Sequence, residues 1–181
     1  MFTVTSKDGT KIAYDKAGRG PALILAGGAF SYRKFPGQVK LAELLAKHFT
    51  VYNYDRRGRG DSGDTQPYQV EREIEDLQAL IDDAGGSAYV WGISSGAVLT
   101  LHAAASGLNI TKLALHEPPF VVDAADRRPP HDFVSHVTAL IAENRRADAV
   151  KYFMTKVIGA PAFVPIVMRL IPGAWSTLMS V

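Results

Sequence analysis

The hydrophobic positions of residues 20–115 follow two periods, one typical of strands and one typical of helices. Short runs rich in apolar, aromatic or β-branched residues predict strands, and the continuous apolar run at 22–26 predicts a strand that is buried on both faces. These predicted strands are 22–26, 50–54, 88–91 and 110–115. Apolar residues spaced three and four apart predict the helices between them. These predicted helices are 38–49, 73–83 with its acids outward, and the segment that opens at Gly96. The alternation predicts an α/β fold with a mostly parallel sheet.

The two ends of the chain follow other patterns. Residues 2–15 alternate weakly around Asp8-Gly9, which predicts an N-terminal antiparallel hairpin. Beyond Pro119 the apolar residues recur at helical spacing, which predicts amphipathic helices. These helical and apolar segments are 133–141, 150–158 and 162–170. We therefore divide the chain into an α/β core and a helical segment. Their bounds are residues 1–120 and 121–181.

A serine bracketed by glycines stands between the predicted strand 88–91 and the helix that follows. Residues 92–96, Gly-Ile-Ser-Ser-Gly, fit the G-x-S-x-G pattern of a nucleophile elbow, a sharp strand-to-helix turn with serine at its tip. Strand and helix pass so close beside this serine that glycine is favoured two residues before and two after it. Framing the turn on Ser94 satisfies both positions, whereas Ser95 does not. We predict Ser94 as a nucleophile on strained backbone with positive φ; a plain Gly/Ser-rich loop is the alternative.

Two backbone regions could bind an oxyanion beside this serine. The Ser95 N–H lies at a helix N-terminus, where unpaired donors and the helix dipole favour negative charge. The glycine loop, Gly27-Gly28-Ala29, follows the strand 22–26 and lets the backbone approach a ligand closely. This loop can offer a second N–H, with a plain tight turn as the alternative.

A loop rich in arginine, aspartate and glycine follows the strand 50–54. Its sequence at residues 55–64 is Asp-Arg-Arg-Gly-Arg-Gly-Asp-Ser-Gly-Asp. Three glycines and interleaved opposite charges predict a tightly folded connection whose charges pair with one another. The G-K-[ST] ending of a phosphate-binding loop is absent from this segment, so we do not favour a phosphate site.

Composition and charge restrict the function classes. The 181 residues are 47% hydrophobic and 21% charged, which is ordinary for one globular domain. Twenty Lys and Arg against 18 Asp and Glu leave a net charge of +2, which argues against nucleic acid or a membrane as a partner. The sequence has no cysteine, which excludes disulfides and a cysteine nucleophile. Without a signal-like or membrane-spanning apolar run, we expect a soluble cytoplasmic protein.

Four motifs, in this order and spacing, resemble the α/β-hydrolase-fold family over residues 2 to about 160. They are the glycine loop, the arginine-rich loop, the elbow at 92–96 and Glu117-Pro118-Pro119. The resemblance implies that Ser94 attacks an acyl carbon and that the N–H groups of Ala29 and Ser95 hold the oxyanion. It implies a serine hydrolase of a small, largely apolar ester or related carbonyl compound, without metal or organic cofactor. The helices beyond residue 130 are similar to the cap that roofs the substrate pocket in many members.

Two features depart from the family pattern. Gly27 stands where many members carry a histidine, which concerns support of the glycine loop rather than the donor. The family's triad acid and histidine usually follow the cap, and this sequence ends within the predicted cap. We therefore expect an incomplete fold, a truncated chain that lacks both residues.

The histidines that are present offer few substitutes for the missing base. They are His48, His102, His116, His131 and His136. The first two are predicted to be structural, and the third could line the pocket but is badly placed to reach Ser94. The last two follow Glu117, Asp123 and Asp126 in the family's chain order, which leaves an unusual triad open. Some members, the haloalkane dehalogenases among them, use an acid just after this strand, although a packing or pocket-rim role is favoured for Glu117 because proline follows it.

Two other classes of function stay open beside the hydrolase. One is a non-catalytic binding module that uses the same fold, and the other is a fragment completed by a second polypeptide. The predicted edge strand 110–115 would present unpaired backbone groups and apolar side chains to water. We therefore expect self-association or a second chain at this edge. The main partner implied by the family resemblance is a small-molecule substrate.

Overall fold

The computed structural model describes residues 1–171, which form two compact units. The first unit is Met1–Pro119, and the second begins at Phe120. Residues 172–181, the end of the predicted helical segment, lie outside the described residues.

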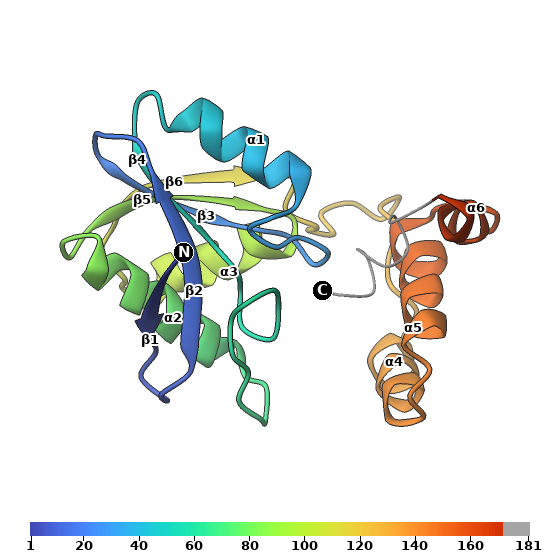
Figure 1. The fold of residues 1–181 in the computed structure, drawn as a ribbon. Helices are drawn as coiled ribbons and strands as arrows, with labels where there is room; N and C mark the ends of the chain where they lie inside the picture. The colour runs from blue at the N-terminus through green and yellow to red at the C-terminus, as the bar shows by residue number, and fades with distance from the viewer. Residues whose placement is uncertain (172–181) are drawn as a thin grey trace. The chain divides into compact units, whose positions relative to one another are not determined.

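The first unit is built on a six-stranded sheet with the order β1-β2-β4-β3-β5-β6 (Figure 1). The strands are β1 Phe2–Thr5, β2 Lys11–Ala17, β3 Ala22–Ala26, β4 Thr50–Tyr54, β5 Ala88–Ile93 and β6 Ile110–His116. The last four strands pair in parallel, whereas β1 and β2 join antiparallel. The predicted hairpin is confirmed, with Phe2 opposite Tyr14 and Val4 opposite Ile12. The predicted α/β fold with a mostly parallel sheet is confirmed as well.

Three helices cover the two faces of this sheet: α1 Pro36–Leu45 on one face, and α2 Val70–Asp83 and α3 Ser95–Ala105 on the other (Figure 1). α1 begins two residues before the predicted start, with Pro36 in its first turn. Proline is favoured there because the N–H groups of the first turn form no hydrogen bond within the helix. It ends at Leu45, before the predicted end at Phe49. The predicted helices are therefore confirmed with shifted ends.

The core lies on both faces of the central strands. Ile24 of β3 packs with Leu77 of α2 and Leu99 of α3. Its neighbours Leu23 and Leu25 point to the other face, where they pack with side chains of α1. Because alternate residues of β3 are buried on opposite faces, the strand reads as a continuous apolar run.

The prediction that the acids of α2 point outward is wrong for two of them. Glu73 is 3% exposed and Asp76 is 1% exposed. Glu73 lies four residues before Leu77, and Asp76 lies four residues before Leu80, so both acids share the buried face of the helix. They meet arginines of the loop at 55–64, which explains how two charges are buried.

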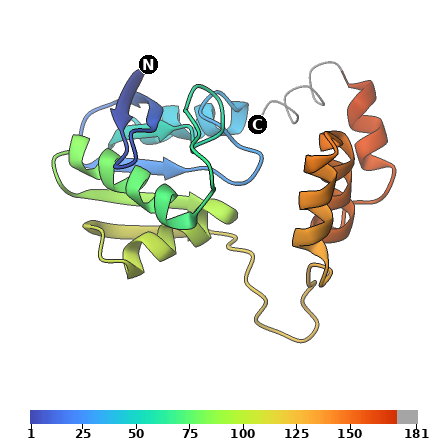
Figure 2. The same cartoon turned by 90° about the horizontal axis from the view of Figure 1, so that it is seen from below.

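The second unit is helical. Its helices are α4 Phe133–Ala142, α5 Arg146–Tyr152, the π-helix η1 Phe153–Ile158, and α6 Val164–Leu170. α4 and α5 lie side by side (Figure 1 and Figure 2), and the ring of Phe133 stacks on that of Tyr152. The expected helices are present, although the second one turns into a π-helix halfway. The cap interpretation of this unit stays a prediction.

β6 forms one edge of the sheet within the described residues. Its Leu115 is 37% exposed, and five of its seven residues are exposed. The edge position was expected, and association at this edge stays a prediction. None of the helices within residues 1–171 has the length and apolar character needed to span a bilayer.

Candidate active site

Ser94 lies at a strained turn between β5 and α3. Its backbone has φ 53° and ψ −122°, a conformation that side-chain-bearing residues rarely adopt. α3 starts at the next residue, Ser95, one position before the predicted opening at Gly96. The predicted elbow with positive φ at Ser94 is therefore confirmed, while the catalytic role of the residue stays a prediction.

The two glycines of the elbow are required by close backbone approach. A Cβ atom on Gly92 would lie 2.6 Å from both the Gly96 carbonyl oxygen and Thr100 Oγ1. A Cβ atom on Gly96 would lie 2.3 Å from the Ala26 oxygen and 2.5 Å from the Gly27 oxygen. The crowding that favoured Ser94 over Ser95 in the sequence is thus present in the fold, and it brings α3 against the end of β3.

The hydroxyl of Ser94 has no hydrogen-bond partner within the described residues. The residue is half-buried, and its Oγ takes part in no hydrogen bond with any of residues 1–171. Its backbone N–H donates to the His116 carbonyl oxygen at 3.0 Å, and its carbonyl accepts from Ala97 N–H at 3.0 Å. The backbone is therefore held from both sides while the side chain stays without a partner.

The glycine loop lies directly beside this hydroxyl. A Cβ atom built on Gly28 would lie 3.4 Å from Ser94 Cβ and 3.9 Å from Ser94 Oγ. Ala29 follows Gly28 in this loop. The structure therefore brings together the two segments that were predicted to supply the oxyanion donors. The convergence of the Ala29 and Ser95 N–H groups on one volume stays a prediction.

Arg56 ties the glycine loop to the elbow. Its Nη1 donates to the Gly27 carbonyl oxygen at 3.2 Å and to Ser95 Oγ at 3.0 Å. Its Nε and Nη2 each donate to Glu73 of α2 at 2.6 Å, a bidentate ion pair. Burial alone would raise the pKa of Glu73, but the hydrogen bond and the charge of Arg56 hold that pKa below its ordinary value.

The arginine-rich loop is tightly folded as predicted, but its arginines do not pair with its own acids. Arg57 donates to Asp76 of α2 at 2.7 and 2.8 Å, and to Asp8 at 2.9 Å. Asp55, fully buried, accepts backbone N–H groups of Arg33 at 2.6 Å and Asp61 at 2.9 Å. The expected internal charge pairing is therefore wrong, because the charges reach elements that are distant in sequence. The sequence interpretation missed Arg56 and Glu73, whose only signal was that Glu73 falls in phase with the apolar face of α2.

Within the described residues, none of the three histidines of the first unit forms a hydrogen bond with Ser94 Oγ. His48 lies in the turn after α1 and His102 lies on α3. His116 ends β6, where its ring stacks on Trp91 with centroids 6.3 Å apart. Glu117 follows with φ 47° and an exposed side chain.

The other candidates for a triad lie in the second unit. They are His131, His136, Asp123 and Asp126. There His136 packs against Tyr152, with ring centroids 4.3 Å apart, and Asp126 accepts the backbone N–H groups of Val122 and Asp123 at 2.9 Å. A triad drawn from these residues stays a prediction.

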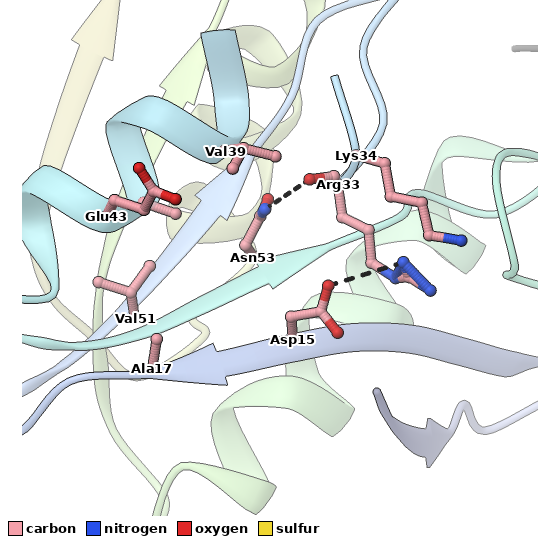
Figure 3. A pocket seen from close by; sticks show the side chains of 9 residues that line it. Asp15, Ala17, Arg33, Lys34, Val39, Glu43, Val51 and Asn53 are labelled. Carbon is pink, nitrogen blue, oxygen red and sulfur yellow. Dashed lines mark hydrogen bonds and ion pairs between the residues drawn. The ribbon is translucent and has the colours of Figure 1, made fainter. Parts of the chain in front are cut away.

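A pocket of about 230 Å³ lies elsewhere in the first unit, between α1, β2 and β4 (Figure 3). Its polar end holds Asn53, whose amide donates to the Arg33 carbonyl at 2.8 Å, and Asp15, which lies 3.6 Å from the Arg33 guanidinium. Its lining includes neither Ser94 nor the glycine loop. We therefore do not assign this pocket to the chemistry of the elbow.

Comparisons with known proteins agree with this geometry. The sequence model of the alpha/beta hydrolase family matches residues 22–178. The crystal structure of an alpha/beta hydrolase from Sphaerobacter thermophilus has 56% sequence identity and a TM-score of 0.91, and the match covers 99% of this chain and 69% of that one. The uncharacterized hydrolase YraK of Bacillus subtilis is 38% identical over 98 residues.

The extent of these matches differs. The match to the Bacillus protein covers 51% of this chain and only 35% of that protein. A thermophilic esterase from Thermogutta terrifontis shares the fold, with a TM-score of 0.71 at 20% identity, covering 99% of this chain and 66% of that one. The family match includes the central strands, the glycine loop and the elbow. On this match, which covers most of its length, the chain belongs to the alpha/beta hydrolase family.

Proposed function

We propose that this protein is a serine hydrolase in which Ser94 is the nucleophile. The observation that carries the proposal is the Ser94 hydroxyl on a strained elbow, unpartnered within residues 1–171, with the glycine loop beside it. Ser94 Oγ bonds to the acyl carbon, the carbonyl electron pair moves onto oxygen, and the N–H groups of Ala29 and Ser95 stabilise this oxyanion. Each such donor contributes about 3 kcal/mol of transition-state stabilisation.

The proton of the Ser94 hydroxyl must pass to a general base. Residues 1–119 place no base in hydrogen-bond contact with Ser94 Oγ. We propose that the histidine and its acid come from outside residues 1–119. A protein without them reacts far more slowly than the complete enzyme, because only the oxyanion donors remain to contribute.

The substrate that we propose is a small, largely apolar ester or related carbonyl compound, because the elbow and the glycine loop together present an uncharged nucleophile and backbone donors to a carbonyl group.

One observation favours a second candidate, a binding module that keeps the fold without the chemistry. This observation is the absence of a base from the hydrogen-bond partners of Ser94 within residues 1–171.

A fluorophosphonate probe separates these two candidates. Its phosphorus forms a bond to the nucleophilic oxygen, fluoride leaves, and the hydroxyl proton passes to a base or to water. We expect mass spectrometry to find the adduct on Ser94, with stoichiometric labelling of the complete enzyme and slower labelling of a chain without its base.

Ser95→Ala is the matched control, because it removes a neighbouring hydroxyl but keeps the backbone N–H at that position. This variant should still be labelled at Ser94. A protein that takes no label, or takes it on another residue, would support the binding module instead.

A further inference from the structure

Arg59 makes one contact that concerns the glycine loop directly. Its Nη1 donates to the Gly28 carbonyl oxygen at 2.8 Å, and the same oxygen accepts the Ser31 N–H at 3.2 Å. The Gly28 carbonyl belongs to the same peptide group as the Ala29 N–H. In a planar trans peptide the C=O and N–H bonds point in opposite directions. A donor that holds the Gly28 oxygen therefore also fixes the direction of the Ala29 N–H.

The peptide between Gly28 and Ala29 needs a contact from outside the glycine loop to fix its orientation. Turning over the peptide between Gly28 and Ala29 rotates ψ of Gly28 and φ of Ala29. Because Gly28 lacks a side chain, this rotation costs less than it would after a residue with a Cβ atom. In the turned-over state a carbonyl oxygen would replace the N–H of Ala29, and two negative oxygens would face each other during the reaction. We propose that Arg59 is a positioning residue that keeps the Ala29 N–H directed at the oxyanion formed on Ser94. The inference rests on the proposed hydrolase function.

Arg56 provides a comparison within the same loop. It holds the Gly27 oxygen at 3.2 Å, so the two arginines clamp consecutive carbonyl groups of the glycine loop. Arg56 is neutralised by Glu73, whereas Arg59 has no carboxylate partner among the residues that the structure describes. An ion pair therefore accounts for the buried charge of Arg56 but not for the position of Arg59.

The charge of Arg59 does not favour folding. Burial, together with repulsion from Arg56, lowers the pKa of Arg59 to about 10. The guanidinium is still charged at neutral pH, and its charged form is less favourable here than in water. This cost offsets the hydrogen bond that Arg59 donates to the Gly28 oxygen, so removal of the side chain should change stability little, which separates a positioning role from a structural one.

The test is the Arg59→Ala variant of the complete enzyme, reacted with a fluorophosphonate probe to give kinact and KI separately. We expect kinact, the maximal rate constant of covalent labelling, to fall by about 10- to 100-fold, which does not exceed the fall in rate caused by loss of a whole oxyanion donor. KI, the probe concentration that gives half of this rate, should stay unchanged. Millimolar guanidinium chloride should restore part of kinact in Arg59→Ala and have no such effect on unaltered protein. Arg19→Ala is the matched control, because Arg19 is exposed and has no ion pair or hydrogen bond within the described residues.

Four results would overturn the inference. Arg59→Ala could react at the unaltered rate, or its loss could lie in KI alone, which would make Arg59 a contact of the ligand instead. A variant that does not fold would also contradict it, because a positioning role predicts unchanged stability. Unaltered protein that takes no label on Ser94 would overturn the proposed function and this inference together, so the two failures are distinguishable.

Discussion

Replacement of Ser94 by alanine is expected to lower kcat/KM of the active protein for p-nitrophenyl acetate by at least ~10³-fold. The elbow presents this one hydroxyl, with φ 53° at its backbone and the glycine loop beside it. Without Oγ, only water can attack the ester, and the oxyanion donors alone contribute the residual rate. Initial rates of p-nitrophenolate release, compared at equal protein concentration and with circular dichroism to verify folding, measure the effect.

Ser95 supplies the internal comparison for this experiment. Its hydroxyl accepts a hydrogen bond from Arg56 at 3.0 Å, and its proposed part in the reaction is played by its backbone N–H. Ser95→Ala should therefore keep far more activity than Ser94→Ala, since it keeps the backbone N–H and removes only one hydrogen bond from a charged donor, which contributes about 1.5 to 3 kcal/mol. Comparable rates for Ser94→Ala and the unaltered protein would show that another group carries out the hydrolysis. That result would contradict the proposal that Ser94 is the nucleophile.

The sequence predicted the parts of the fold that depend on local patterns. The strands from 22–26 to 110–115 were predicted from short runs rich in apolar, aromatic or β-branched residues, and the structure places a strand at each of them. The elbow was recognisable from its local G-x-S-x-G pattern. Only Gly92 is crowded by residues close in sequence, because the atoms that crowd Gly96 belong to Ala26 and Gly27. Ser94 could be chosen over Ser95 from the same pattern.

The missing parts of the prediction depend on contacts between distant segments. Arg56 and Glu73 are 17 residues apart, and Arg59 and Gly28 are 31 residues apart. No periodicity of the loop at 55–64 shows which carbonyl or carboxylate each arginine reaches. Charge alone predicts that the acids of α2 face water, whereas the helical phase that Glu73 shares with Leu77 predicts burial. A charged residue on the apolar face of a predicted helix therefore indicates a buried partner of opposite charge. It does not contradict the prediction of the helix.

Glu73→Gln is expected to lower the free energy of unfolding by about 3 to 5 kcal/mol, because the variant leaves the Arg56 guanidinium buried without its counter-charge. The two side chains are 4% and 6% exposed, so water cannot replace the lost carboxylate. Urea unfolding at pH 7, followed by tryptophan fluorescence, measures this loss. Glu71→Gln is the matched control on the same helix turn, since Glu71 is exposed, and it should change stability by less than about 0.5 kcal/mol.

The ion pair also predicts how the loss varies with pH. Because the pKa of Glu73 is lowered by Arg56 in the folded protein, the carboxylate contributes stability above its ordinary pKa near 4.5, and this contribution is lost as pH falls through the folded-state pKa. The stability difference between Glu73→Gln and the unaltered protein should therefore be largest at neutral pH and shrink in acid. Adding Arg56→Met to Glu73→Gln removes the unpaired charge and should recover part of the loss at pH 7. The contrary result would be an equal loss of stability at pH 7 and at pH 3, with no recovery in the double variant. It would show that Glu73 acts through packing and not as the counter-charge of Arg56, which joins the glycine loop to the elbow.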